Sequence, residues 1–165
     1  MDKINLYIYT TISGPGRKDG SYTYLLEYIT EKGPVTLTKQ GTLEKVTENQ
    51  ANLQVLNEAL KRMNKPCEVT IFTESRYLQQ GAEHWIRDWQ QSGWITARKK
   101  PVANREEWEK AAELLGQHQI TFSVRQDHSY RMWIREETEK KEGERRKCLI
   151  DSENLTAQQK STKQQ

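Results

Sequence analysis

The sequence predicts one α/β domain with a mixed five-stranded sheet, in which three antiparallel strands are followed by two parallel strands, and helices flank the sheet. Three alternating segments joined by short links predict the antiparallel part: Ile4–Ile8, Tyr22–Ile29 and Val35–Leu43. Two later alternating segments, 69–73 and 120–124, are separated by helical patterns, which is typical of parallel strands. A length of 165 residues is enough for one such core.

The links and the first helix have clear local signals. Ser13-Gly14-Pro15-Gly16 and Gly33-Pro34 are typical turn sequences. Thr47 and Gln50 have the spacing of a capping box, which predicts the start of a helix. Apolar residues then recur at helical spacing, at Leu53, Leu56, Leu60 and Met63.

The stretch from Cys67 to Trp108 is the most informative part of the chain. Its strand ends on Glu74, so a carboxylate is expected at the carboxyl edge of the sheet, where α/β proteins place their sites. A short helix is predicted to stop at Gly81, and a second helix carries tryptophans at helical spacing. A basic loop follows, and Asn104 with Glu107 predicts the N-terminal cap of another helix.

The C-terminal part changes character. A final helix is predicted from His128, with Tyr130, Trp133 and Ile134 as its apolar contacts. The run from Arg135 to Lys147 has six bases and five acids, so its charges nearly cancel and a solvated helix is favoured over a basic arm. The predicted division is a domain over residues 1–135 and a charged helical extension with a flexible polar tail over 136–165.

Composition bounds the compartment and the partners. Cys67 and Cys148 have no CxxC spacing and no histidine at metal spacing, so they predict reduced thiols of a cytoplasmic protein. No stretch approaches the length and hydrophobicity of a membrane span. The net charge of +3 permits nucleic-acid binding, and the distribution favours it: residues 84–105 hold five Arg or Lys against one acid.

Several segments together resemble the type 1 ribonuclease H family, and bacterial members with a basic protrusion most closely. The matching segments are LYIYTTIS (6–13), TENQANL (47–53), TESRYLQQG (73–81), HWIRDWQQSGW (84–94), KKPVAN (99–104) and LGQHQI (115–120). They occur in the family's order over residues 3–135, which is far more specific than a single short motif. The resemblance implies the fold predicted above.

The resemblance also implies a two-metal cleavage of the RNA strand of an RNA/DNA hybrid, with four carboxylates that hold the metals. The matching positions in this chain are Thr11, Asn52, Glu74 and, by gapless count, Thr138. His128 matches the histidine of the family's mobile loop, without its flanking Gly and Pro, and the glycine after the first aspartate is Ile12. Glu136, Glu137 and Glu139 are acidic neighbours of Thr138.

The chemistry of these residues argues against ordinary two-metal hydrolysis. Thr11 and Asn52 can offer oxygen atoms but no negative charge, and two hard cations need a cluster of carboxylates. At most one metal is expected, on Glu74. No cofactor is therefore predicted, and any remaining activity would depend on Mg²⁺ or Mn²⁺. Without the carboxylates, His128 is expected to be a surface or helix-start residue.

The resemblance implies that the protrusion grips the DNA strand of a hybrid. The expected nucleic-acid contacts are Thr47, Trp85, Arg87, Arg98, Lys99, Lys100 and Arg105. Trp85, Trp89, Trp94 and Trp108 are expected to be packing residues of the protrusion more than a stacking platform. Lys-rich turns are also common on proteins that bind no nucleic acid. Glu48, where the family has Asn, would repel a phosphate.

Three functions follow from these observations. The first is a catalytically degenerate ribonuclease H-like protein that binds RNA/DNA hybrid or other duplex nucleic acid without two-metal cleavage. The alternative is a protein-interaction module that keeps only the fold. The third is an active hybrid endoribonuclease with an altered metal site.

Overall fold

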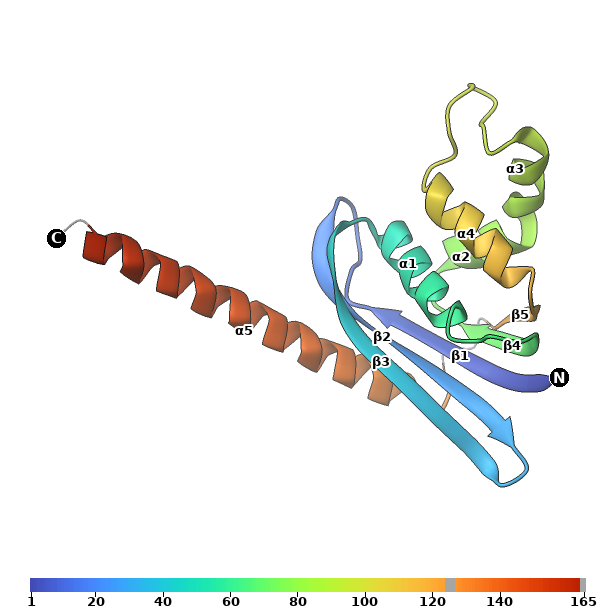
Figure 1. The fold of residues 1–165 in the computed structure, drawn as a ribbon, viewed down its shortest axis with the longest axis horizontal. Helices are drawn as coiled ribbons and strands as arrows, with labels where there is room; N and C mark the ends of the chain where they lie inside the picture. The colour runs from blue at the N-terminus through green and yellow to red at the C-terminus, as the bar shows by residue number, and fades with distance from the viewer. Residues whose placement is uncertain (124–126, 164–165) are drawn as a thin grey trace.

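A computed structural model describes residues 1–123 and 127–163. The described residues form one five-stranded sheet in the order β3-β2-β1-β4-β5 (Figure 1). Its strands are β1 (Asp2–Thr10), β2 (Lys18–Thr30), β3 (Gly33–Val46), β4 (Cys67–Phe72) and β5 (Gln119–Ser123). The first three strands are antiparallel, whereas β4 is parallel to both β1 and β5. The predicted fold class is confirmed.

The pairing of β1 with β4 determines where a site can form. These strands are parallel neighbours, with Ile4 opposite Val69 and Leu6 opposite Ile71. Their carboxyl ends therefore meet at the same edge of the sheet. Thr11 follows β1 and Glu74 follows β4, so the chain brings these two side chains to one place.

Helices cover the two faces of the sheet. The helix α1 (Glu48–Leu60) packs on one face, and α5 (Arg131–Lys163) packs across β2, β1 and β3 on the other (Figure 1). Thr47 caps α1 as predicted, because its hydroxyl accepts a hydrogen bond from the Gln50 backbone N–H at 3.1 Å. The side chain of Gln50 donates to Glu107 instead of returning to Thr47, so only half of the capping box forms.

The main core lies between the sheet and the helices that include α1 and α4 (Arg105–Leu115). It contains Leu6, Leu26, Leu53, Leu56 and Ile71, all fully buried. Trp108 on α4 is also fully buried, and it packs beside Trp89 at a ring-centroid distance of 5.4 Å. Trp89 and Trp94 pack against this core as predicted, whereas Trp85 contacts Tyr77 and Trp89 without being part of it.

The prediction of a helix end at Gly81 was wrong. Helix α2 (Arg76–Gln80), the π-helical turn η1 (Gly81–Trp85) and α3 (Ile86–Ser92) follow one another without a break. Gly81 has ordinary right-handed helical dihedrals, φ −61° and ψ −47°. A Cβ atom there would lie 2.1 Å from the ring of Trp108. Glycine is therefore required for close packing, not for chain reversal.

The loop after α3 forms a small hairpin that stands away from the sheet (Figure 1). Gly93 ends α3 in the left-handed conformation, with φ 71°. The backbone N–H of Thr96 donates to the Lys100 carbonyl at 2.8 Å, and Ile95 bridges Pro101. Asn104 does not cap α4 as predicted, because it is itself left-handed (φ 58°). Its side-chain amide donates to the Tyr77 hydroxyl at 3.2 Å instead.

The C-terminal part differs from the prediction in two respects, the start of α5 and the exposure of Trp133. Helix α5 begins at Arg131, three residues after His128. The expected strand residue Val124 lies outside the described residues. Ile134 and Tyr130 pack inward as predicted, but Trp133 is 42% exposed, because its position is turned about 100° around α5 from the buried Ile134.

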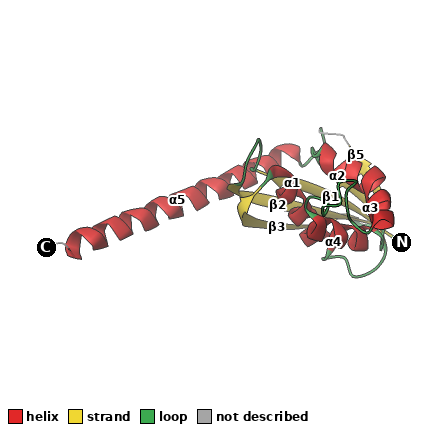
Figure 2. Ribbon diagram, turned by 90° about the horizontal axis from the view of Figure 1, so that it is seen from above, coloured by secondary structure: helices red, strands yellow, loops and turns green. Residues whose placement is uncertain are grey.

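The predicted boundary at residue 135 falls inside α5. Thr138 and Glu142 are buried, so the packed part of the chain extends past it. The helical extension continues to Lys163 and projects well beyond the sheet (Figure 2). Its Glu, Lys, Arg and Gln residues are good helix formers. None of the helices in 1–123 and 127–163 is long and apolar enough to cross a membrane.

We expect Gly81→Ala to destabilise the protein by about 1–3 kcal/mol, because the added methyl group must displace Trp108. Urea unfolding followed by tryptophan fluorescence measures this difference. Gly143→Ala is the matched control: it lies in α5 with open space around the position, so alanine there should be neutral or stabilising by up to about 1 kcal/mol. Equal effects of the two changes would contradict the packing role of Gly81.

Candidate functional site

A cavity of about 510 Å³ opens at the sheet edge where β1 and β4 end. Thr11, Asn52 and Glu74, three of the four positions that the sequence pointed to, all line it. Glu48 from the first turn of α1 and three residues of α5 complete its charged lining: Arg131, Arg135 and Glu139. The parallel pairing of β1 with β4 and the start of α1 nearby bring these residues together, although they are far apart in the sequence.

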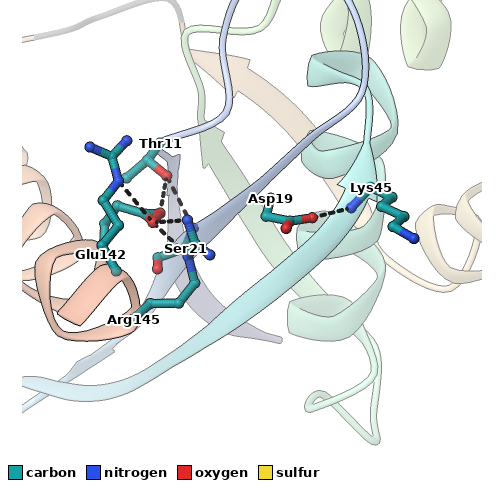
Figure 3. A network of polar contacts seen from close by, with 7 residues as sticks. Thr11, Asp19, Ser21, Lys45, Glu142 and Arg145 are labelled. Carbon is teal, nitrogen blue, oxygen red and sulfur yellow. Dashed lines mark hydrogen bonds and ion pairs between the residues drawn. The ribbon is translucent and has the colours of Figure 1, made fainter. Parts of the chain in front are cut away.

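Thr11 is held by two hydrogen bonds of opposite direction. Its hydroxyl accepts from the Ser21 backbone N–H at 3.0 Å and lies 3.1 Å from Glu142 Oε2, to which it donates (Figure 3). The Thr11 backbone N–H also donates to the Ser21 carbonyl at 3.0 Å. A carboxylate at position 11 would accept the first bond but has no proton for the second.

Glu142 is a buried carboxylate, with 4% of its surface exposed. Its Oε1 accepts from Arg145 Nε at 2.6 Å (Figure 3). The Nε atom of Arg146 lies 3.6 Å from the same oxygen. The Arg145 side chain is itself 18% exposed. A buried charge is tolerated when it is paired and its lone pairs are satisfied, and Arg145 and Thr11 meet both conditions here.

Thr138 does not join the cavity. Its buried hydroxyl contacts the Thr23 hydroxyl at 2.6 Å and the Ile134 carbonyl oxygen at 2.5 Å. Thr138 lies one helical turn after Ile134 and one turn before Glu142, on the face of α5 that packs against the sheet. The gapless count therefore ends on a residue that docks the helix, whereas Arg135 and Glu139 face the cavity.

The acids of the cavity are few and partly engaged. Asn52 donates to the Glu48 carbonyl at 3.0 Å, Glu48 accepts from the Gly14 N–H at 3.2 Å, and Glu139 accepts from the Tyr9 hydroxyl at 3.0 Å. Glu74 is the one carboxylate at the positions matched to the family. Among the described residues, no three His, Cys, Asp or Glu side chains are placed to hold a metal ion. This donor set does not fit a pair of hard divalent cations.

Arg131 and Arg135 are residues of the site that the sequence analysis missed. They lie four residues apart on α5, and Glu139 follows at the same spacing, so all three share one face of the helix. Neither side chain forms an ion pair or hydrogen bond with another residue that the structure describes. The four-residue spacing was the signal in the sequence. It could not be recognised there, because charged residues occur on all sides of this part of the helix.

His128 packs beside the cavity instead of standing free on the surface. Its ring lies 4.4 Å from that of Tyr7 and 5.5 Å from that of Phe72. Burial lowers the pKa of His128, Arg131 lowers it further, and Glu74 and Asp127 act in the opposite direction. Burial also raises the pKa of Tyr9, and its hydrogen bond to Glu139 adds to the shift. The neutral forms of both side chains are therefore favoured.

Apart from Thr47, the residues expected to contact nucleic acid lie in a separate region that comprises the end of η1, α3, the hairpin loop and the start of α4. Arg87, Arg98, Lys99 and Lys100 are exposed, and none of them pairs with an acid in the described parts of the chain. Arg105, by contrast, is paired with Glu109 at 2.6 Å. Trp85 is half-buried between Tyr77 and Trp89, at ring-centroid distances of 5.9 and 5.7 Å. Thr47 is engaged in capping α1.

Comparison with known proteins shows the relationship. The ribonuclease H family profile matches residues 5–138. The chain belongs to the ribonuclease H family. It is 32% identical over 127 residues to the ribonuclease H of Pelobacter propionicus, which covers 76% of this chain and 74% of that protein. It is 40% identical over 90 residues to the ribonuclease H of Nitratidesulfovibrio vulgaris strain DP4, covering 54% of this chain and 58% of that relative's length.

Solved ribonucleases H share the fold at lower sequence identity. The crystal structure of LC9-RNase H1, a type 1 RNase H with the type 2 active-site motif, superposes with a TM-score of 0.72 at 23% identity, covering 86% of this chain and 72% of that one. The solution structure of the PFV RNase H domain gives a TM-score of 0.52 at 20% identity, covering 84% and 90%. The resemblance noted from the sequence segments is thereby confirmed at the level of family and fold.

We expect Thr11→Asp to destabilise the folded protein by about 2–4 kcal/mol at neutral pH, because it places a second carboxylate against buried Glu142. Repulsion from the neighbouring carboxylate raises the folded-state pKa of the introduced aspartate above its unfolded value. The loss should therefore be full above that pKa and shrink as the pH falls through it towards about 4. Urea unfolding across this pH range measures it.

Thr11→Val is the control for the loss of the hydroxyl alone. It removes both hydrogen bonds without adding charge, so we expect a loss of about 1–3 kcal/mol that lacks the same pH dependence. A Thr11→Asp variant as stable as the wild type at neutral pH would show that the contact with Glu142 does not shape this site.

Proposed function

We propose that this member of the ribonuclease H family binds RNA/DNA hybrid or another nucleic-acid duplex through its basic protrusion and does not cleave it by two-metal chemistry. The observation that carries the proposal is the state of Thr11. At the position expected to bridge two metals, this chain has a hydroxyl whose proton is donated to a buried, arginine-paired carboxylate. The position serves to dock α5 and adds no charge to the cavity.

The charge of the cavity supports the same proposal. The formal charge of the residues that line the cavity is −1, from three acids and two bases: Glu48, Glu74, Glu139, Arg131 and Arg135. Two divalent cations bring a charge of +4, and the carboxylates of a metal cluster must offset most of it. A local charge of −1 is too small for that. One cation on Glu74 would also lie in a cavity that already contains two guanidinium groups.

The protrusion supports binding without cleavage. Arg98, Lys99 and Lys100 follow one another in an exposed hairpin loop, free of ion pairs with the described residues. Such groups neutralise phosphates and release counterions, which gives affinity without sequence preference. Structures of the similarly folded foamy viral protease-reverse transcriptase have been solved in complex with dsDNA and with RNA/DNA hybrid, at TM-scores of 0.58 and 0.53. The tryptophans beneath the loop hold it in place.

A binding titration tests the proposal directly. We expect the protein to bind a fluorescent RNA/DNA hybrid in anisotropy measurements, more weakly at about 200 mM salt than at about 50 mM. Replacing Arg98, Lys99 and Lys100 together by Ala should weaken binding and reduce the salt slope by about 1–3, because each lost phosphate contact lowers it by roughly 0.9. Replacing Lys32, Lys110 and Lys160 by Ala removes the same charge elsewhere and is the control.

Cleavage is tested in parallel with the same hybrid in Mg²⁺ and in Mn²⁺. We expect no products above background. Absence of binding at low salt would instead favour a protein-interaction role for the fold. Cleavage that Glu74→Gln abolishes would show an active enzyme with an altered metal site, and would overturn the proposal.

A further inference from the structure

We infer that the cavity contains a metal-free phosphate site. In this site Arg131 and Arg135 bind a phosphate group directly, in place of the cations that a two-metal enzyme would use. The inference rests on the proposed function, which it extends from the protrusion to the cavity at the ends of β1 and β4. The ligand class is a phosphate group, either a phosphodiester of a bound duplex or a free phosphate.

The first support is the position of the two guanidinium groups. Both Arg131 and Arg135 line the 510 Å³ cavity together with Thr11 and Asn52. They also line, with His128 and Glu74, a smaller hollow between α5 and the ends of β1 and β4. One arginine follows the other after one turn of α5, so both approach the same volume from one side.

The second support is that these arginines are unpaired within the described part of the protein. An arginine has five N–H donors in a planar fork, and it binds phosphate through two parallel hydrogen bonds. Arg105, Arg145 and Arg146 spend their donors on Glu109 and Glu142. Arg131 and Arg135 have no such partner among the described residues, although Glu74 and Glu139 line the same cavity. Their donors therefore remain available to a ligand.

The three acidic residues of the cavity are not evenly distributed within it: only Glu74 also lines the smaller hollow. Glu139 is bound to the Tyr9 hydroxyl and Glu48 to the Gly14 N–H, which holds both towards the β1 side. In the smaller hollow, the charged residues are Arg131 and Arg135 against Glu74, and His128 is held towards its neutral form. This end of the cavity carries a formal charge of +1 (two bases less one acid), which is the sign that an anion requires.

Polar residues and the start of α5 complete the surroundings of the two arginines. Thr10, Ser13, Asn52 and Ser75 also line the cavity, although Thr10, Asn52 and Ser75 form hydrogen bonds within their own segments. Arg131 is the first residue of α5, so the positive end of a 33-residue helix lies at the same place. The two guanidinium groups and this helix N-terminus are positive, which suits phosphate oxygens and not a metal ion.

The experiment measures hybrid binding by anisotropy in buffer with EDTA, for the wild type and for Arg131→Gln with Arg135→Gln. We expect the wild type to bind without metal, and the double variant to bind about tenfold more weakly with a salt slope reduced by about 1–2. Lys140→Gln with Lys147→Gln is the matched control, since both are exposed lysines of α5 that do not line the cavity. Equal losses in the two double variants would overturn the assignment.

Inorganic phosphate distinguishes the site from the rest of the proposed function. We expect phosphate, against chloride at equal ionic strength, to raise the melting temperature of the wild type and of the protrusion variant, but not that of the arginine variant. If the wild type is stabilised by phosphate in this way but does not bind the hybrid, the phosphate site is supported and the proposed duplex binding is contradicted. If hybrid binding requires Mg²⁺ and is unaffected by the arginine changes, the phosphate site is contradicted and duplex binding is supported.

Competition between the two ligands identifies the source of the phosphate. If phosphate displaces the hybrid from the wild type but not from the arginine variant, the duplex places a phosphodiester in the cavity. If phosphate stabilises the wild type without weakening hybrid binding, the site takes a free phosphate. Either result supports a phosphate site on Arg131 and Arg135.

Discussion

The docking of α5 depends on one buried carboxylate. Glu142 is almost fully removed from solvent, and an unpaired charge in such a place costs several kcal/mol. Arg145 balances its charge and Thr11 donates a hydrogen bond to it, so the helix can lie against the sheet at this point. Ile134, two turns earlier on the same face of α5, packs with Tyr7 and Leu25 and adds about 1.5–3 kcal/mol from the burial of its side chain.

This contact links the packing of a helix to the chemistry of the site. Thr11 is the side chain that a two-metal enzyme would use as a carboxylate, and here its proton is needed by Glu142. A return to aspartate would disturb both the site and the docked helix. The two residues therefore have to be considered as a pair, and the substitution at position 11 is tied to a residue that lies 131 positions later in the chain.

The fold tolerates this change because its stability comes from elsewhere. The apolar core between the sheet, α1 and α4 contains none of the cavity residues that carry charge. The protrusion is likewise held by Trp85, Trp89, Trp94 and Trp108, whose rings contact one another or Tyr77. The scaffold and the basic loop can thus persist while the side chains at the ends of β1 and β4 change.

The local periodicity of the sequence was enough to predict the strands and the first helix, and the resemblance of several ordered segments pointed to the family. Thr11 and Glu74 could be placed at one sheet edge because parallel strands end together, and Asn52 followed from its helix. The role of Gly81 was predicted wrongly. The sequence alone does not distinguish a glycine that ends a helix from one that leaves room for a distant side chain, here Trp108, 27 residues later. Asn104 was misjudged for a similar reason, because Tyr77 competes for its amide.

Only the tertiary structure decided which residues of α5 belong to the site. The segment from Arg135 to Lys147 carries charge around the whole helix, so no apolar stripe shows which face turns inward. Docking on the sheet places Ile134, Thr138 and Glu142 inside and leaves Arg131, Arg135 and Glu139 facing the cavity. That choice depends on Thr11, just after β1, and Thr23 in β2, both more than a hundred residues away, which local periodicity does not contain.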